Sequence, residues 1–291
     1  MIVYQFAASA RVLISKMPAF LAYGIASAVG DATYLVWPRG RRNMIKSVAS
    51  LLECDENDSR PRKIARKCMR NFCKYAMDIL RYSYPREDFF DKQFKVSGLE
   101  NLDQALNEGK GVILVSFHLG NLDLGARLLS HLGYPVHAVV NNLASGQLDK
   151  FLQQPRAQSG LKLIKSMDIS SRLLDILRRN EALALMIDCP NKGDGVGVRL
   201  GKHRAMFPSG AAVMALRTGA RVVPCGLVRT SNTTFQGFIG KPIDYQPIGK
   251  VAEDVKALTQ SAVKSLEEMT RAFIDQWYIF HPLILDEAQE G

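Results

Sequence analysis

The sequence predicts an α/β fold, in which helices flank a central, mostly parallel sheet and an N-terminal helical part precedes it. Two observations lead to this prediction. From about residue 95 onward, short apolar runs alternate with helical patterns, which is typical of α/β domains. The apolar runs are continuous and rich in β-branched residues, as in strands buried on both faces. The chain has 291 residues, 47% of them hydrophobic, so it can bury the large core that such a sheet needs.

Four segments are predicted to be strands, because each is an apolar run of strand length: 111–117, 135–140, 182–187 and 221–228. Helical periodicity predicts helices at residues 101–108, 122–132, 147–158, 169–179 and 209–218. A long last helix is predicted over 251–278, with a single apolar stripe formed by Val255, Leu258, Ala262, Leu266, Met269 and Phe273.

Residues 17–37 form a long apolar segment near the start of the chain. Its length matches the ~20 residues that cross a bilayer, but Asp31 lies inside it. A basic cluster follows, made of Arg39, Arg41, Arg42 and Lys46. An apolar segment beside a basic cluster suits an interfacial anchor on an anionic leaflet, which would make the N-terminal part membrane-facing. A buried first helix of the globular core explains the same segment, and the sequence leaves both alternatives open.

Residues 59–82 are predicted to form a strongly amphipathic helix. Its apolar face repeats at helical spacing through Ile64, Cys68, Phe72, Tyr75 and Ile79. The opposite face is basic, which most often means a solvated face and alternatively a surface for lipid phosphate. Residues 84–88 then break the helix. We therefore divide the chain into an N-terminal helical, membrane-associating segment, residues 1–90, and an α/β domain, residues 91–291, without a flexible linker.

The net charge of the chain is +10 and its pI is about 9.4. This balance favours an anionic partner, which means nucleic acid, an acidic membrane surface or an acidic substrate. The five cysteines form no C-x-x-C pair, and we interpret them as reduced, mostly buried thiols of a cytosol-facing protein. Neither cysteines nor histidines cluster at metal-ligand spacing, so we expect no zinc site.

The stretch VSFHLGNLDLGARLL, residues 115–129, places His118 and Asp123 directly after a predicted buried strand. In open α/β sheets, ligands bind at the carboxyl ends of the strands. Gly120 and Asn121 suit a strand-to-helix turn, which can bring the two side chains together. A carboxylate that orients an imidazole is the arrangement of a general base, and the helix N-terminus offers a site for an anionic group. A structural histidine that caps the turn is the alternative.

Three further positions follow a predicted strand or precede a predicted helix. Asp188 follows a strand and precedes Pro190, so it either caps a turn or holds a substrate hydroxyl. Gly210 begins a helix whose N-terminus is either a phosphate site or a capped structural end. The GDGVG segment, residues 193–197, lacks the helix that must follow a dinucleotide-binding loop and the Lys-Ser/Thr pair of a P-loop, so we interpret it as a flexible hairpin or lid.

Several blocks of the sequence resemble one known family, and they occur in the same order. The H-x-x-x-x-[DE] motif after an apolar strand resembles the lysophospholipid acyltransferase superfamily. The string SFHLGNLDLGARLL resembles its bacterial branch of lipid A lauroyl/myristoyl acyltransferases and phosphatidylinositol mannoside acyltransferases. The resemblance spans about residues 95–285, and the helical start with its basic cluster is also similar. Three further blocks resemble that branch: RAQSGLKLI (156–164), LMIDCPNKGDGVGVRLGKHRAMFPSGAAVMALRTGARVVPCGLVR (185–229) and DQWYIFHP (275–282).

The resemblance implies acyl transfer from an acyl thioester, of coenzyme A or acyl carrier protein, to a hydroxyl group of a membrane lipid. It assigns His118 as general base and Asp123 as the group that orients it, without a covalent acyl-enzyme and without a metal or redox cofactor. The oxyanion donors would be Arg156 and backbone N–H groups near Gly120 and Asn121, although Arg156 could equally bind a phosphate. We expect substrate contacts at Gly120, Asn121, Arg156, Asp188, Arg199, Gly201 and Gly210.

The sequence departs from the family pattern in two places. Asp123 stands where the branch often has Glu, with Leu122 in place of a Trp. Arg199 and the leucine after it replace the usual aromatic pair before Gly201, which leaves the acyl-chain or acceptor preference open. We interpret Trp277 and the histidine near it, His281, as core or interface residues.

The resemblance places the protein at the cytoplasmic face of the cell membrane, peripheral or anchored through its N-terminal segment, with an anionic membrane surface as partner and no nucleic acid. The acceptor stays open between a lipid A precursor, a mannosylated phosphatidylinositol and a lysophospholipid. A basic nucleic-acid- or membrane-binding protein without catalysis is the alternative from another class, and the charge supports it, although no nucleic-acid-binding motif is recognised. A catalytically silent scaffold is a third alternative, against which the intact His118–Asp123 motif argues.

Overall fold

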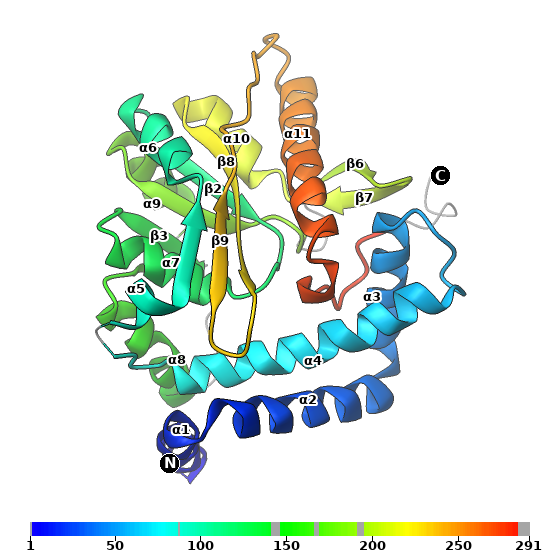
Figure 1. The fold of residues 1–291 in the computed structure, drawn as a ribbon. Helices are drawn as coiled ribbons and strands as arrows, with labels where there is room; N and C mark the ends of the chain where they lie inside the picture. The colour runs from blue at the N-terminus through cyan, green and yellow to red at the C-terminus, as the bar shows by residue number, and fades with distance from the viewer. Residues whose placement is uncertain (1, 87, 141–145, 166–168, 191–194, 285–291) are drawn as a thin grey trace.

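The computed structural model describes residues 2–86, 88–140, 146–165, 169–190 and 195–284. Figure 1 shows a central sheet with helices on both sides and two long N-terminal helices across one end. The helices are α1 (Ile2–Lys16), α2 (Ala19–Val36), α3 (Pro38–Leu51), α4 (Ser59–Arg81), α5 (Phe89–Gln93), α6 (Leu99–Asn107), α7 (Leu122–His131), α8 (Gly146–Gln158), α9 (Ile169–Arg178), α10 (Gly210–Thr218) and α11 (Val251–Arg271). The strands are β1 (Phe94–Ser97), β2 (Val112–Ser116), β3 (Val136–Val140), β4 (Lys162–Lys165), β5 (Ala182–Met186), β6 (Val196–Leu200), β7 (His203–Phe207), β8 (Arg221–Arg229) and β9 (Phe235–Ile239).

Seven strands form the main sheet in the order β1-β9-β8-β2-β5-β3-β4. Every neighbouring pair is parallel except β8 and β9, which pair antiparallel. The predicted mostly parallel α/β sheet is therefore confirmed, and all four predicted strands are present. Since β2 lies at the centre of the sheet between β8 and β5, all five of its residues are buried. The strands β6 and β7 form a separate antiparallel hairpin.

The strands that the sequence did not predict are short and lack a continuous apolar run. β1 has only four residues, and their burial alternates. β4 carries a lysine at each end, Lys162 and Lys165, because it is an edge strand. β9 is interrupted by Gly237, which packs against the side chains of Val96 and Leu227. Such patterns do not distinguish a strand from a loop, so only the assembled sheet reveals them.

The last predicted helix is shorter than expected. α11 ends at Arg271 instead of residue 278, and a single 3-10 turn, η2 (Ile274–Gln276), leads into extended backbone. The helical periodicity continues beyond Arg271, but backbone pairing of residues 277–278 with the loop after β2 prevents a helix there. The backbone N–H of Tyr278 donates to the carbonyl oxygen of His118 at 2.9 Å, and Leu119 forms an antiparallel bridge with Trp277. The segment after α11 therefore closes over the loop that follows β2.

The helices α3 and α4 contribute to the same core as the sheet. Met44 of α3 and Cys68 of α4 are fully buried in one cluster with Ile113 of β2. On the other face of β2, Leu114 belongs to a second cluster with Leu102 of α6. The two clusters alternate along β2, as expected for a strand covered on both faces. The division of the chain into residues 1–90 and 91–291 stays a prediction, and α3 and α4 pack as core elements.

The apolar segment near the start of the chain forms α2, which runs lengthwise beside α4 at one edge of the molecule (Figure 1). In the described part of the chain, α2 is the one helix whose length and apolar composition would allow it to cross a membrane. Only 22% of this helix is buried. The alternative of a buried first core helix is therefore wrong, and α2 is a candidate membrane-facing segment.

A buried charge pair connects α2, α4 and β8 beside the strand ends. Asp78 of α4 is 1% exposed and forms an ion pair with Arg229 of β8. The same carboxylate accepts hydrogen bonds from the Tyr23 hydroxyl of α2 at 2.7 Å and from Nδ2 of Asn121 at 2.8 Å. Both carboxylate oxygens are thus satisfied, as the burial of a charge requires.

We expect the substitution Asp78→Ala to lower the free energy of unfolding by about 3–5 kcal/mol, because it leaves the charged Arg229 buried without its partner. Urea denaturation followed by circular dichroism measures the change. The control is Asp91→Ala, which removes an exposed carboxylate that contacts His131 and should cost less than about 1 kcal/mol. Equal losses in the two variants would show that the buried pair contributes no special stability.

Candidate active site

The loop between β2 and α7 adopts the turn that the sequence predicts. Gly120 has a φ of +67°, and a Cβ atom at this position would lie 1.9 Å from the carbonyl oxygen of Leu227, so only glycine fits. Asn121 caps α7, and its side-chain oxygen accepts from the backbone N–H of Leu124 at 3.1 Å. His118 therefore lies in the turn itself and Asp123 in the first turn of α7, as predicted.

The imidazole of His118 is hydrogen-bonded to Asp188. The distance from Nδ1 of His118 to Oδ1 of Asp188 is 2.6 Å, and the backbone N–H of His118 donates to Oδ2 at 2.8 Å. Asp188 follows β5, which pairs with β2 in parallel register, so the carboxyl ends of the two strands bring these residues together. The Asp188 carboxylate is fully buried, whereas the side chain of His118 is 33% exposed.

The segment after α11 completes the surroundings of this carboxylate. Trp277, fully buried, donates from Nε1 to Oδ2 of Asp188 at 2.9 Å. Nε2 of His281 lies 2.7 Å from the carbonyl oxygen of Asp188. Our interpretation of Trp277 and His281 as core or interface residues thus missed their contacts with the site. The Gln-Trp block was the one signal in the sequence that could have indicated them, because it resembles a block of the same family.

Asp123 contacts Arg156 of α8 instead of His118, so the predicted hydrogen bond between Asp123 and the imidazole is corrected. Asp188, which follows β5, lies beside the imidazole of His118. Asp123, in the first turn of α7, lies toward α8 instead. Nη1 of Arg156 also donates to Oε1 of Gln153 at 2.9 Å. Burial and, next, the charge of Asp123 raise the pKa of Tyr75 of α4 to about 12.

The predicted oxyanion donors in the turn are already engaged. The backbone N–H of Gly120 donates to the carbonyl oxygen of Gln276 at 2.8 Å, and that of Asn121 donates to the carbonyl oxygen of Leu227 at 2.8 Å. The expectation that these two groups stabilise an oxyanion is therefore corrected. Of the predicted donors, Arg156 keeps one nitrogen, Nη2, without a hydrogen bond to any residue that the structure describes.

His118 and Asp188 stabilise each other's charged form. Burial alone would lower the pKa of His118, but the charge of Asp188 and its hydrogen bond raise that pKa above the usual value. Burial would raise the pKa of Asp188, but the neighbouring His118, its backbone N–H and the Trp277 N–H bring it below its usual range. The carboxylate is therefore ionised at neutral pH, and the imidazole is a stronger base than that of a free histidine.

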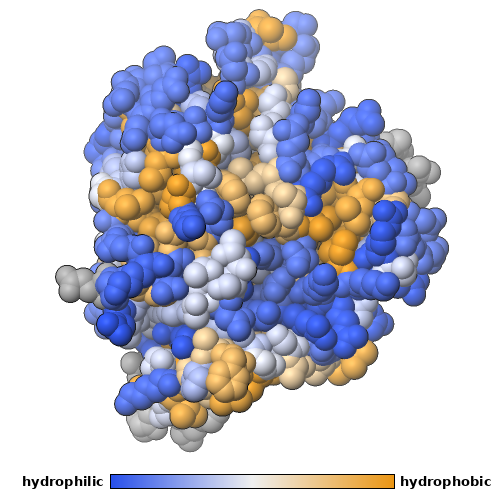
Figure 2. Space-filling view, in the orientation of Figure 1, coloured by the Kyte–Doolittle hydropathy of each residue, from blue (hydrophilic) through white to orange (hydrophobic). Residues whose placement is uncertain are grey.

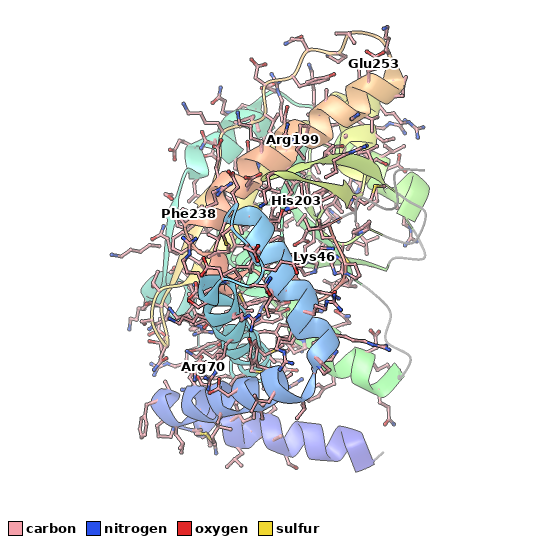
Figure 3. The ribbon with its side chains drawn as sticks, turned by 90° about the vertical axis from the view of Figure 1, so that its right-hand side faces the viewer. Lys46, Arg70, Arg199, His203, Phe238 and Glu253 are labelled. Carbon is pink, nitrogen blue, oxygen red and sulfur yellow. The ribbon has the colours of Figure 1, made fainter. Side chains whose placement is uncertain are left out.

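The other predicted contact residues lie in different surroundings. Arg199 and Gly201 belong to the β6–β7 hairpin, whose backbone N–H groups at these positions donate to Gln260 and Glu267 of α11. Figure 3 shows Arg199 on this hairpin beside α11. Gly210 begins α10, as predicted, and is exposed. None of these three residues has a hydrogen bond to His118 in the described part of the chain, and their substrate contacts stay a prediction. Part of the GDGVG segment, residues 193–194, lies outside the described residues, and residues 196–197 belong to β6.

The chain matches one known family over almost its whole length. The model for the bacterial lipid A biosynthesis acyltransferases matches residues 2–285, nearly the whole chain. The chain belongs to this family. It is therefore an acyltransferase of lipid biosynthesis, as the motifs predicted. The match includes α1 to α4, so the N-terminal helices belong to the family pattern together with the α/β part.

Curated relatives of this family member are acyltransferases from mycobacteria. It is 23% identical over 279 residues to a phosphatidylinositol mannoside acyltransferase of Mycolicibacterium smegmatis, an alignment that covers 93% of this chain and 87% of the relative. It is 25% identical over 201 residues to a phosphatidylinositol mannoside acyltransferase of Mycobacterium tuberculosis, which covers 67% of this chain and 61% of the relative. The predicted resemblance to this branch is thus confirmed.

Proposed function

We propose that the protein transfers a fatty acyl group from an acyl thioester, of coenzyme A or acyl carrier protein, to a hydroxyl group of a membrane glycolipid or lysophospholipid. One observation carries this proposal: the Nδ1 atom of His118 lies 2.6 Å from the buried Asp188 carboxylate. With an ionised carboxylate as acceptor, Nδ1 carries the proton and Nε2 keeps its lone pair. Nε2 has no hydrogen bond to the described residues, so it is available to a substrate.

In the proposed reaction, Nε2 of His118 removes the proton of the acceptor hydroxyl as that oxygen attacks the thioester carbonyl carbon. The tetrahedral intermediate then collapses, the carbon–sulfur bond breaks, and the protonated Nε2 returns the proton to the leaving thiolate. The products are an ester and a free thiol, and the enzyme ends in its starting state. The raised pKa of His118 makes the imidazole a stronger base for the first of these proton transfers.

Asp188 acts in this proposal as the group that holds the imidazole. It fixes the tautomer through Nδ1 and stabilises the imidazolium that forms during attack. Trp277 and the backbone N–H of His118 occupy the second carboxylate oxygen, so the carboxylate cannot rotate away without losing two further hydrogen bonds. Asp188 was predicted to hold a substrate hydroxyl or cap a turn, and its full burial favours the positioning role.

Asp123 is proposed to position Arg156 for substrate. The ion pair fixes the guanidinium through Nε, which leaves Nη2 for the oxyanion or for a phosphate of donor or acceptor. The side chains of Arg156 and Asp123 are 18% and 9% exposed, so the pair is sheltered yet reachable. The proposed location is the cytoplasmic face of the cell membrane.

The test is an acyltransferase assay with purified full-length protein, acyl-CoA, and vesicles that contain one acceptor at a time. We expect release of free thiol that depends on the acceptor, together with a mass increase of the lipid by one acyl group. Mannosylated phosphatidylinositol, a lipid A precursor and a lysophospholipid are the three acceptors, and acyl carrier protein replaces coenzyme A in a parallel series. If no combination yields an acylated lipid, the proposed function is wrong.

We expect Asp123→Asn to lower turnover by about 10²-fold, because Arg156 loses the charge that fixes it, and small displacements of an orienting group are costly. The pH at which activity falls on the acid side should not change, since His118 bonds to Asp188 and not to Asp123. Initial rates between pH 5 and 9 measure both effects. If the fall in activity at low pH moves to another pH in this variant, Asp123 and not Asp188 would be the residue that orients the imidazole.

A further inference from the structure

The helix α2 packs one face against α4 and exposes an apolar face on the other side. These contacts with α4 determine how α2 can lie relative to a membrane. We propose that α2 lies in the plane of the membrane, with its outward face buried in one leaflet, and that it does not cross the bilayer. The proposal rests on the proposed function in one respect only, namely that the outward face is taken to contact lipid. Its geometry comes from the contacts of α2 with α4.

The inward face of α2 consists mostly of small residues, which allows it to pack closely against α4. Its buried residues include Ala22, Ala26 and Gly30. A Cβ atom on Gly30 would lie 2.6 Å from the Cα atom of Arg70, so the two helix backbones approach closely at this point. Such contact of small residues lets two helices pack closely along their length. A membrane-crossing orientation would have to separate α2 from α4 along this whole surface.

Polar contacts hold the same face of α2 in place. The Asp31 carboxylate accepts from Nε of Arg66 at 2.7 Å and from Nη2 of Arg70 at 2.6 Å, both on α4. The Tyr23 hydroxyl donates to Asp78 of α4 at 2.7 Å. If α2 crossed the bilayer, Asp31 would lie in the hydrocarbon without these two arginines, which is expensive for a carboxylate. Docked on α4, the charge is paired and stays at the water side.

The outward face of α2 is apolar along its whole length. Six aliphatic or aromatic side chains of α2 have large exposed fractions, and these are Phe20 (74%), Leu21 (45%), Ile25 (44%), Val29 (52%), Leu35 (70%) and Val36 (78%). Gly24, Ala28 and Ala32 lie between them and are exposed as well. Figure 2 shows hydrophobic side chains along the lower edge of the molecule, where α1 and α2 lie in Figure 1. An unbroken apolar face of this length is not a surface that water normally covers.

The surroundings of this face indicate a lipid surface and not a protein partner. Exposed basic side chains flank both ends of α2, with Lys16 before it and Arg39 and Arg42 after it. The whole chain carries a net charge of +10. An apolar helix face bordered by lysine and arginine is the pattern of a helix at the boundary of headgroups and acyl chains of an anionic leaflet. The occupant we commit to is therefore an anionic bilayer.

This orientation brings the active-site loop near the membrane. Tyr23 of α2 bonds to Asp78 of α4, and Asp78 in turn accepts from Asn121, which caps α7 three residues after His118. One helix layer, α4, therefore separates the membrane helix from the turn that carries the imidazole. A single side chain, Asp78, thus contacts both the membrane helix and the residue that caps α7.

The first experiment compares the full chain with the variants Ile25→Lys and Val29→Lys in flotation with vesicles of phosphatidylglycerol and phosphatidylcholine. We expect each lysine to lower the vesicle-bound fraction at least tenfold, because it places a charge in the centre of the apolar face. The matched controls are Ile248→Lys and Val251→Lys, which alter side chains that are 65% and 75% exposed beside the start of α11, and these should float like the unaltered protein. Thermal unfolding checks that all four variants fold.

Three results of this experiment would overturn the proposal. Flotation that is unchanged by the two lysines would show that the face is not in the leaflet. An unaltered protein that does not bind vesicles of pure lipid would point to a protein partner. A dimer in light scattering that the lysines dissociate would assign the face to a second copy of the chain. None of these readouts requires turnover, so failure of the proposed acyl transfer and failure of this inference are distinguishable.

The second experiment separates an in-plane helix from a membrane-crossing one. Different epitope tags are placed at the two ends of the full chain, and protease is added to intact spheroplasts and to inverted inner-membrane vesicles of the expression host. We expect both tags to be digested in the same preparation, since an in-plane α2 leaves both ends on one side. Digestion of the N-terminal tag in one preparation and of the C-terminal tag in the other would show that α2 crosses the bilayer.

Discussion

Replacing His118 by alanine should abolish acyl transfer while leaving the fold intact. The reason is that no other described side chain takes the place of Nε2, and general-base catalysis of this kind contributes about 10²–10⁴-fold. The loss should appear in turnover more than in the concentration of acceptor at half-maximal rate, because the imidazole acts on the transferred proton. Acceptor-dependent release of thiol from acyl-CoA measures the effect.

The control for this variant is His131→Ala, which removes an exposed imidazole at the end of α7 that contacts Asp91. It should transfer acyl groups at the normal rate. Circular dichroism and flotation with vesicles show whether His118→Ala still folds and binds membranes. Near-normal turnover of a folded His118→Ala protein would end the general-base assignment, and the mechanism proposed here with it.

The substitution Asp188→Asn should lower turnover by about 10²–10⁴-fold and also move the pH dependence. The amide keeps the size of the carboxylate but does not carry the charge that stabilises the imidazolium. Burial of His118 remains, and burial lowers the pKa of an imidazole, so the pKa of His118 should fall in this variant. The same substitution leaves the Trp277 N–H opposite a group that no longer carries a negative charge.

The direction of the pH shift follows from the role of the ring. The base must be neutral to accept a proton, so activity is lost as the pH falls below the pKa of His118. In the unaltered protein Asp188 raises this pKa, and the acid limb should lie above the ordinary histidine value of about 6.5. In Asp188→Asn the limb should move to lower pH even as the maximal rate decreases. A limb that stays in place would show that Asp188 does not set the pKa of the catalytic group.

The local parts of the site could be predicted from the sequence, whereas its long-range pairing could not. The continuous apolar run before His118 predicted a buried strand, and Gly120 and Asn121 indicated the turn after it. The partner of the imidazole comes from β5, which lies next to β2 in the sheet but far away in the chain. Strand order is a tertiary property, so a motif of six residues suggested the nearer carboxylate, Asp123.

The same limit explains the other differences between prediction and structure. Helical periodicity continues past Arg271, but pairing of Trp277 with the His118 loop ends the helix. Asp31 weakened the interpretation of 17–37 as a membrane segment, because a sequence does not show that Arg66 and Arg70 stand opposite it. Amphipathic spacing on α4 did not indicate that Asp78 is buried, since its cationic partner comes from β8.

The place of Trp277 in the chain has a consequence for the order of events during synthesis. α2 emerges from the ribosome early and can meet lipid while most of the protein is still being translated. The ring of Trp277 and the backbone around it arrive only after all the sheet strands, so the hydrogen bonds around Asp188 cannot be complete until nearly the whole chain has been translated.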